Sequence, residues 1–336
     1  MTGTSSGDTN CHLESVTLKV TLVLVLTLKI FQRAEIAKYR SRQHFQKVVR
    51  GRPCTLDTSA RLPYTEVKMR KLSPEENVAA IYSTLRRVWG PQHWWPARSR
   101  FEVIVGAYLT QNTSWRNVEL AMRKLRLARV LSLEGIRNVS VTRLESLIRS
   151  SGYFRQKARN LKIFVKFVDR NYRGSLTRMF ARPTAELREQ LLSLNGVGPE
   201  TADSILLYAG QHPIFVVDAY TRRLAVRHGI LGENADYEEF RNLFERALLN
   251  AELIELRGSM APAEADMHPR FGNVRGPIAH RPSPMSLVKR TPLAQVFNDM
   301  HGLLVSAGKH YCLKSKAQCE QCPLGWLLPT SQTTNG

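Results

Sequence analysis

The sequence feature that most restricts the fold is a turn with two glycines at Leu194–Ala202 (LNGVGPETA), called here the glycine-cornered turn. It lies between two segments whose apolar residues have helical spacing. Gly196 and Gly198 can adopt positive φ and carry no Cβ, which suits a tight turn between helices, and Pro199 stands where the second helix would begin. Such a hairpin can direct backbone N–H groups toward a DNA phosphate. A plain turn between packed helices is the alternative interpretation.

The chain after residue 72 has the pattern of helices throughout. Ser73-Pro74-Glu75-Glu76 places serine at the N-cap, proline at the first helical position and glutamate at the third, which predicts a capping box. Further amphipathic helices are predicted at 100–110, 115–127, 142–150, 154–170, 184–194, 200–209, 218–228, 236–249 and 293–308. Strand-like alternation is not evident after residue 72, so we expect an all-α fold.

Segments that lack helical periodicity suggest how the chain is divided into structural parts. Residues 1–71 have little periodicity outside 34–49 and are expected to be a poorly structured basic extension. Residues 257–292 contain six prolines and are expected to be a flexible insertion. We expect two helical lobes with a DNA-binding cleft between them. One lobe comprises residues 101–214 and ends in the hairpin, and the other comprises residues 72–100 and 215–336.

The charge balance favours a polyanionic partner. The chain has 49 Lys and Arg against 28 Asp and Glu, a formal net charge of +21, and residues 1–71 contribute only +8 of it. Nucleic acid is the first candidate partner and an anionic membrane surface the second, while a solvated basic face is the plain alternative. The apolar run at 20–28 is too short to span a bilayer and lacks the flanks of a signal peptide. We therefore expect a cytoplasmic monomer that acts with the chromosomal DNA and not at a membrane.

A carboxylate follows the hairpin at a position that suits a catalytic residue. Asp218 comes after the apolar residues Phe215–Val217 and just before a predicted helix. In that place it can serve as an ordinary helix N-cap. It can also stabilise positive charge that develops on a sugar, or activate a water molecule.

The turn and this aspartate together resemble the helix-hairpin-helix-Gly/Pro-Asp superfamily of DNA glycosylases, of which endonuclease III is the type member. The family motif Leu-x-Gly-Val-Gly-x-Lys-Thr-Ala is similar to residues 194–202, and the family's catalytic aspartate lies eighteen residues after the lysine, which corresponds to Asp218. Residues 109–113 (LTQNT) and 151–158 (SGYFRQKA) are also similar to family segments, and the resemblance covers roughly 72–251 and 293–323. It implies a double-stranded DNA partner with a damaged base, bound by Gln111, Asn112, Asn195, Gly196, Val197, Gly198, Glu200 and Thr201.

One departure from the family pattern bears on the reaction. Glu200 occupies the position of the family's lysine, whose amine can form a Schiff base with the sugar and so cut the strand. A carboxylate cannot, which favours a monofunctional glycosylase that uses water as nucleophile. The alternatives are a bifunctional glycosylase/AP lyase acting on oxidised pyrimidines, with another lysine as substitute, and a non-catalytic DNA-binding protein that keeps only the hairpin.

The positions of several tryptophans suggest which type of damaged base the protein binds. Clustered tryptophans more often pack in a protein core or anchor a surface contact than line a ligand-binding pocket. However, the sequence Trp94-Trp95-Pro96, followed later by LTQNT and Trp115, is similar to the 3-methyladenine DNA glycosylase III branch. That resemblance implies that Trp95, Pro96 and Trp115 line the base pocket, with Lys309 as the pocket lysine. N3-alkylated adenine is cationic, so stacking and cation–π attraction of ~0.5–2 kcal/mol per contact can select it, and it needs no strong general acid to leave.

Three of the five cysteines cluster near the C-terminus. Cys312, Cys319 and Cys322 have the spacing C-x6-C-x2-C, as in the family's [4Fe–4S] loop, but the fourth position is Leu328. Four thiolates are the normal requirement for such a cluster. Three could bind a cluster with a different fourth ligand, or could be relics of a lost one, and the sequence leaves both outcomes open.

Overall fold

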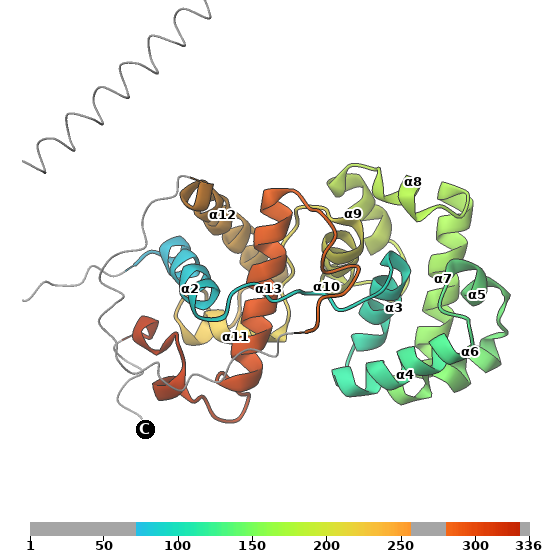
Figure 1. Ribbon diagram of the computed structural model, residues 1–336, viewed down its shortest axis with the longest axis horizontal. Coiled ribbons are helices and arrows are strands. Elements are labelled where there is room, and N and C mark those ends of the chain that lie inside the picture. The colour runs from blue at the N-terminus through green and yellow to red at the C-terminus, as the bar shows by residue number, and fades with distance from the viewer. Residues whose placement is uncertain (1–71, 257–279, 330–336) are drawn as a thin grey trace, which may run out of the picture. The chain divides into compact units, whose positions relative to one another are not determined.

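The computed structural model describes residues 72–256 and 280–329, which lie within one compact unit, Arg70–Gly336 (Figure 1). Throughout these residues the regular elements are helices, and the only β pairing is an isolated bridge between Cys312 and Ala317. The fold is therefore all-α, as predicted. Among the described helices, none combines the length and the apolar composition that crossing a bilayer would require.

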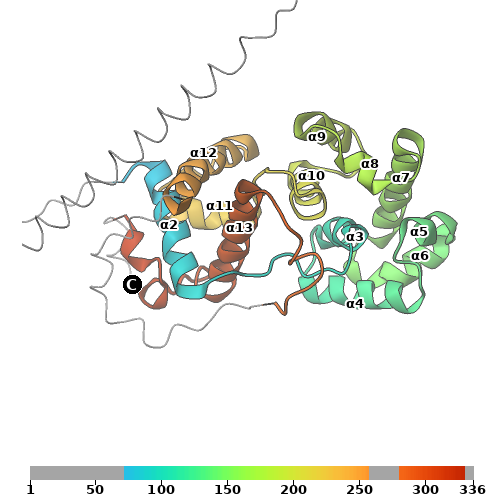
Figure 2. The same ribbon diagram turned by 45° about the horizontal axis from the view of Figure 1, so that its top comes forward.

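One group of helices, called here the first helical group, runs from α3 to α10 (Figure 2). Within it α3 packs against α4 and α7, while α6 contacts both α4 and α7. Several of these helices begin at a serine whose hydroxyl accepts a hydrogen bond from the backbone three residues on, which stabilises each start by about 1 kcal/mol. The elements are α3 (Arg100–Thr110), α4 (Trp115–Leu127), α5 (Leu133–Asn138), α6 (Val141–Ile148), α7 (Phe154–Tyr172), α8 (Leu176–Phe180), α9 (Thr184–Leu192) and α10 (Pro199–Ser204).

The second helical group brings the start of the described chain together with its end. It contains α2 (Pro74–Trp89), α11 (Ala219–Arg227), α12 (Tyr237–Leu256) and α13 (Pro292–His310). The predicted capping box is present at α2: the Glu76 backbone N–H donates to Ser73 Oγ at 3.1 Å, and the Ser73 N–H donates to the Glu76 carboxylate at 2.8 Å. Helix α13 contacts α2, α11 and α12 and is buried along most of its length. It is the central helix of this group.

Buried aromatic rings hold the second group together. Phe215 stacks on Phe244 with ring centroids 4.9 Å apart and meets Phe297 edge-on at 5.8 Å. All three side chains are almost completely buried. Because Phe215 lies three residues before Asp218, this packing also fixes the segment that presents the aspartate.

The structure differs from the sequence expectation in several places, including α12, which extends to Leu256 and not to residue 249. Helices α5 and α8 were not predicted, because six and five residues are too few to show a periodicity. The single helix predicted at 200–209 is instead α10 followed by a π-helical turn at Ile205–Gly210. The end of the expected insertion, residues 280–292, is ordered: the Met285 N–H donates to the Ala97 carbonyl at 3.0 Å. Residues 1–71 and 257–279 lie outside the described residues.

The aromatic packing predicts a large stability effect at Phe215. Phe215→Ala removes a fully buried ring from between two others, so we expect it to lower the free energy of unfolding by about 3–5 kcal/mol. Urea unfolding followed by circular dichroism measures this. The exposed Leu127 is the control, since Leu127→Ala should change stability by no more than about 0.5 kcal/mol. Equal effects of the two variants would contradict the packing argument.

Candidate active site

The glycine-cornered turn lies between α9 and α10, as the sequence predicted. Gly196 has φ +80°, and a Cβ at this position would lie 1.9 Å from the side-chain nitrogen of Asn160, so only glycine fits. Gly198, in contrast, has open space where a Cβ would stand. Of the residues expected to bind DNA here, Asn195, Gly198 and Glu200 are exposed, Gly196 is half-buried, and Val197 and Thr201 are buried.

The end of α3 is joined to this turn by a side chain. Gln111 Nε2 donates to the Gly196 carbonyl at 3.0 Å and to Thr201 Oγ1 at 2.8 Å. The next residue, Asn112, is exposed and has φ +52°. The Gln111 amide nitrogen is thus occupied within the protein, whereas Asn112 is the residue of this pair that faces solvent.

A buried lysine fixes the end of α3 to the start of α7. Lys157 Nζ donates to three backbone carbonyls, those of Leu109 at 2.9 Å, Gln111 at 2.8 Å and Ser151 at 2.7 Å. Burial lowers the pKa of Lys157 to about 8. The sequence showed Lys157 only as part of a family segment, without a role, because its three partners come from two separate turns.

Asp218 is the N-cap of α11, and its side chain is largely buried. Its Oδ1 accepts from the Thr221 backbone N–H at 2.8 Å, while its Oδ2 lies 3.5 Å from His301 Nε2. Burial alone would raise the pKa of Asp218, but nearby His301 and the Thr221 hydrogen bond more than offset this and hold it below its ordinary value. With 14% of its side chain accessible, the ionised carboxylate reaches the surface of the site.

His301 is a site residue that the sequence analysis missed. It lies on α13, is 3% exposed, and its ring faces those of Trp94 and Tyr208 at 5.8 and 5.7 Å. In the sequence it is a single polar residue within an apolar helix. Its approach to Asp218, together with its burial, identifies it as part of the site.

Glu200 forms an unequal pair with Asp218. It lies in the first turn of α10, and although the residue as a whole is exposed, the protein around its carboxyl group and the charge of Asp218 raise its pKa to about 7, which His301 partly opposes. Near neutral pH, Asp218 is therefore ionised while Glu200 is divided between its two forms. One fixed carboxylate and one carboxyl group able to take up a proton are the components of acid–base chemistry.

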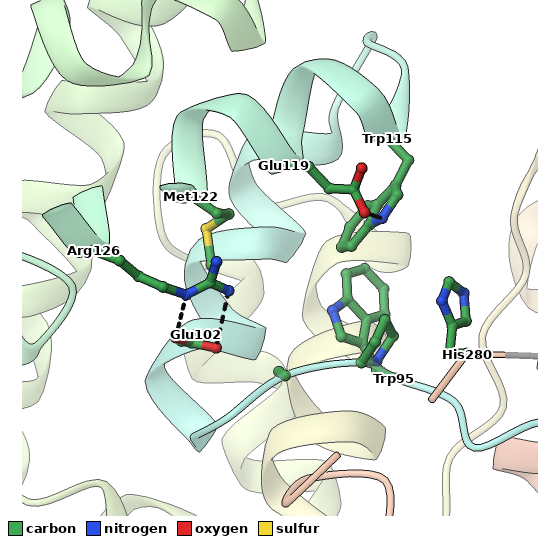
Figure 3. Close-up of a pocket in the computed structure, with 9 residues that line it drawn as sticks. Trp95, Glu102, Trp115, Glu119, Met122, Arg126 and His280 are labelled. Atoms are coloured by element: carbon green, nitrogen blue, oxygen red, sulfur yellow. Dashed lines mark hydrogen bonds and ion pairs between the residues drawn. The ribbon is translucent and has the colours of Figure 1, made fainter. Parts of the chain in front are cut away.

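An aromatic cavity of about 140 Å³ is lined by two tryptophans, Trp95 and Trp115 (Figure 3). Trp95 meets Trp115 edge-on with ring centroids 5.2 Å apart, and Tyr208, whose pKa is raised by burial and by the charge of Asp218, is also 5.2 Å from Trp95. The cavity is small beside the ~300–1,000 Å³ of sites for drug-sized ligands, which suits a single ring system. Its lining consists of Trp95, Pro96, Ala97, Glu102, Trp115, Glu119, Met122, Arg126 and His280.

Three of the four residues expected to form a base pocket thus line one cavity. The fourth, Lys309, is not among the described lining residues. It is half-buried on α13, close enough to Asp218 and Glu119 for both charges to raise its pKa, although burial outweighs them and lowers it. Lys309 therefore lies within electrostatic range of both Asp218 and the cavity residue Glu119.

The cysteine cluster does not complete a metal site within the described residues. Cys312 is buried and its Sγ accepts from Arg227 Nη1 at 3.2 Å, while Cys319 and Cys322 are partly exposed. Over residues 72–256 and 280–329, no set of three or more His, Cys, Asp or Glu side chains has an arrangement that could hold a metal ion. With Leu328 in the fourth position, the donors present do not fit a four-thiolate cluster.

Comparison with known proteins gives a consistent result. Residues 105–248 match the family described as HhH-GPD superfamily base excision DNA repair protein. The chain is 39% identical over 251 residues to a DNA repair glycosylase candidate of Methanocaldococcus jannaschii, covering 74% of this chain and 94% of that protein. The structure of H. pylori 3-methyladenine DNA glycosylase bound to 1,N6-ethenoadenine matches with a TM-score of 0.53 at 27% identity, covering 71% and 98% of the two chains. A trapped endonuclease III–DNA covalent intermediate shares the fold, with a TM-score of 0.54 at 19% identity over 76% and 95%.

The contacts of Lys157 predict a pH-dependent loss of stability in Lys157→Met. Methionine leaves three buried carbonyls without their donor, which we expect to cost about 1–3 kcal/mol near neutral pH. The folded-state pKa of about 8 lies below the ordinary value of 10.5, so the unfolded chain binds more protons between these values, and the wild type gains stability as pH rises through that window.

Urea unfolding of both proteins from neutral to alkaline pH measures the effect. The difference between wild type and variant isolates Lys157 from other groups that titrate in this range. A difference that stays constant or shrinks as pH rises would contradict the assignment.

Proposed function

Because the chain belongs to the HhH-GPD superfamily of base excision DNA repair proteins, we propose that it is a monofunctional DNA glycosylase that removes an alkylated purine. The observation that carries this proposal is the combination, in one chain, of the ionised, largely buried Asp218 with an aromatic cavity lined by Trp95 and Trp115. All these residues come from one chain, so a monomer suffices for the reaction.

Asp218 supplies charge stabilisation in the proposed reaction. As the bond between base and sugar breaks, the bonding electron pair leaves with the base and positive charge grows on the sugar, which the carboxylate stabilises. Water adds to the sugar carbon and gives up one proton. An N-alkylated purine is already positively charged and leaves as a neutral base, so no strong general acid is needed.

Glu200 fits the role of proton acceptor for that water. Its pKa of about 7 means that a substantial fraction is ionised at neutral pH and ready to take a proton. A carboxylate cannot form a Schiff base with the sugar, which supports hydrolysis without strand cleavage.

DNA binding is assigned to the hairpin and the end of α3. Asn195 and Gly198 are the exposed residues of the turn, and the open space at Gly198 permits close approach of a phosphate to the backbone at the start of α10. Asn112, exposed and at positive φ, is better placed than the hydrogen-bonded Gln111 to enter the gap left by a flipped base. The net charge of +13 outside residues 1–71 favours the DNA backbone as the partner.

One observation supports a second candidate, a bifunctional glycosylase/AP lyase. Lys309 lies near Asp218, and burial lowers the pKa of its amine, which favours a neutral nucleophile. Borohydride treatment during the reaction discriminates between the candidates. Hydrolysis predicts no covalent enzyme–DNA adduct, whereas an adduct that Lys309→Gln abolishes would establish the lyase.

The role of Asp218 predicts a large loss of activity in Asp218→Asn. Removing the charge should slow base release from an oligonucleotide containing 3-methyladenine by about 10²–10⁴-fold, while binding to the same DNA changes little. Asp236 is a matched control, since its Oδ1 also accepts a backbone N–H, from Glu239 at 2.8 Å, at the start of a helix. Asp236→Asn should retain activity, and full activity of Asp218→Asn would refute the proposed function.

The raised pKa of Glu200 predicts a pH-dependent rate. Wild-type base release should increase from about pH 6 to about pH 8 as the carboxyl group, with its pKa of about 7, loses its proton and becomes a base. Glu200→Gln should release the base more slowly and lack this rise. Single-turnover rates measured across the range test the role, and an unchanged rise in the variant would assign it to another group.

A further inference from the structure

We propose that Glu119 is the specificity-determining residue that makes the aromatic cavity prefer a positively charged base over a neutral one. The inference rests on the proposed function, since it concerns the base that enters this cavity. It goes beyond that function because aromatic rings also stack on neutral bases and favour a cation only through cation–π attraction, whereas a carboxylate attracts a cation directly.

Glu119 is held in place at the cavity by a tryptophan. Its Oε1 accepts a hydrogen bond from Trp115 Nε1 at 2.9 Å, one turn earlier on α4. The Trp115 ring in turn meets Trp95 edge-on at 5.2 Å. Figure 3 shows the carboxylate beside the Trp115 ring, on the side of α4 that faces the cavity. Although Glu119 is exposed, this hydrogen bond places its negative charge next to the ring that would contact a bound base.

The other charges that line the cavity cancel. Glu102 and Arg126 form an ion pair at 2.9 Å, and Glu102 also accepts the Arg98 backbone N–H at 2.8 Å. The pKa of His280 is lowered by burial and by Lys309, against the opposing effect of Glu119, so its ring is neutral near neutral pH. Among the described residues that line the cavity, Glu119 thus supplies the uncompensated charge.

Lys309 explains why such a charge is needed. Its ammonium group lies close enough to interact with Glu119, Asp218 and His280, and a cationic base in the cavity would be repelled by it. Because Asp218 is already paired with His301, Glu119 is the carboxylate that offsets this positive charge at the cavity. The arrangement favours an N-alkylated purine, whose ring carries a positive charge and whose exocyclic amino group can donate to a carboxylate.

Glu119→Gln tests the charge alone, because the amide oxygen can still accept from Trp115 Nε1. We would measure single-turnover release of 3-methyladenine, which is cationic in DNA, and of the neutral 1,N6-ethenoadenine from otherwise identical duplexes. The variant should lose about fivefold on the cationic base and little on the neutral one. Glu134→Gln makes the same charge change on α5, outside the cavity, and should leave both rates unaltered. An unchanged ratio of the two rates in Glu119→Gln would overturn the inference.

A binding measurement separates this inference from the proposed function. Quenching of tryptophan fluorescence by N1-methyladenosine, a cation near neutral pH, is compared with quenching by neutral adenosine. Wild type should bind the cation more tightly, and Glu119→Gln should lose that difference. Absence of base release by the wild type together with this binding preference would refute the glycosylase proposal but support the role of Glu119. Equal binding of the two nucleosides by wild type would overturn the role of Glu119 itself.

Discussion

A carboxylate that is almost buried must be compensated to stay ionised, and the compensation of Asp218 is the constraint on which the rest of the site depends. The first contribution is local: as N-cap of α11, Asp218 accepts the Thr221 N–H and lies at the positive end of the helix dipole. The second comes from a distant part of the chain, because His301 lies on α13. The aspartate can therefore serve as a charged group only while α11 and α13 stay packed together.

The packing of these two helices is correspondingly close. A Cβ on Gly308 would lie 2.4 Å from the Tyr220 ring, so glycine is required where the helices approach. Arg223 reinforces the contact by donating to the carbonyls of Gly308 at 3.1 Å and Cys312 at 2.7 Å. The same contacts fix the last turn of α13, which carries Lys309. The C-terminal cysteine segment thus has a structural role in holding this end of α13, independent of any metal.

Much of the fold and part of the site could be predicted from the sequence because their causes are local. The hairpin follows from Gly196 and Pro199, and the capping box from Ser73 and Glu76. His301 could not be predicted as a partner of Asp218, since the two residues are 83 positions apart and only the packing of α13 brings them together. The π-helical turn at Ile205–Gly210 has no local signal either.

Glu119 combines a local contact, which the sequence indicates, with a non-local one, which it does not. Its spacing of four from Trp115 predicts a contact on one helix face, and the structure contains it. The sequence does not show that Trp95, from a loop before α3, completes a cavity against that face.

The three carboxyl groups of the site have different surroundings and hence different uses. Asp218 is compensated by a backbone N–H and an imidazole and stays charged, whereas burial and the Asp218 charge raise the pKa of Glu200 to about 7, which suits the proposed role of proton acceptor. Glu119 is held by an indole N–H at the cavity proposed to take the base. A lysine at position 200 would pair with Asp218 and offer an amine to the sugar. In the proposed reaction, glutamate instead adds negative charge around the single positive charge that moves from the base to the sugar, which favours water as the nucleophile and a charged base as the substrate.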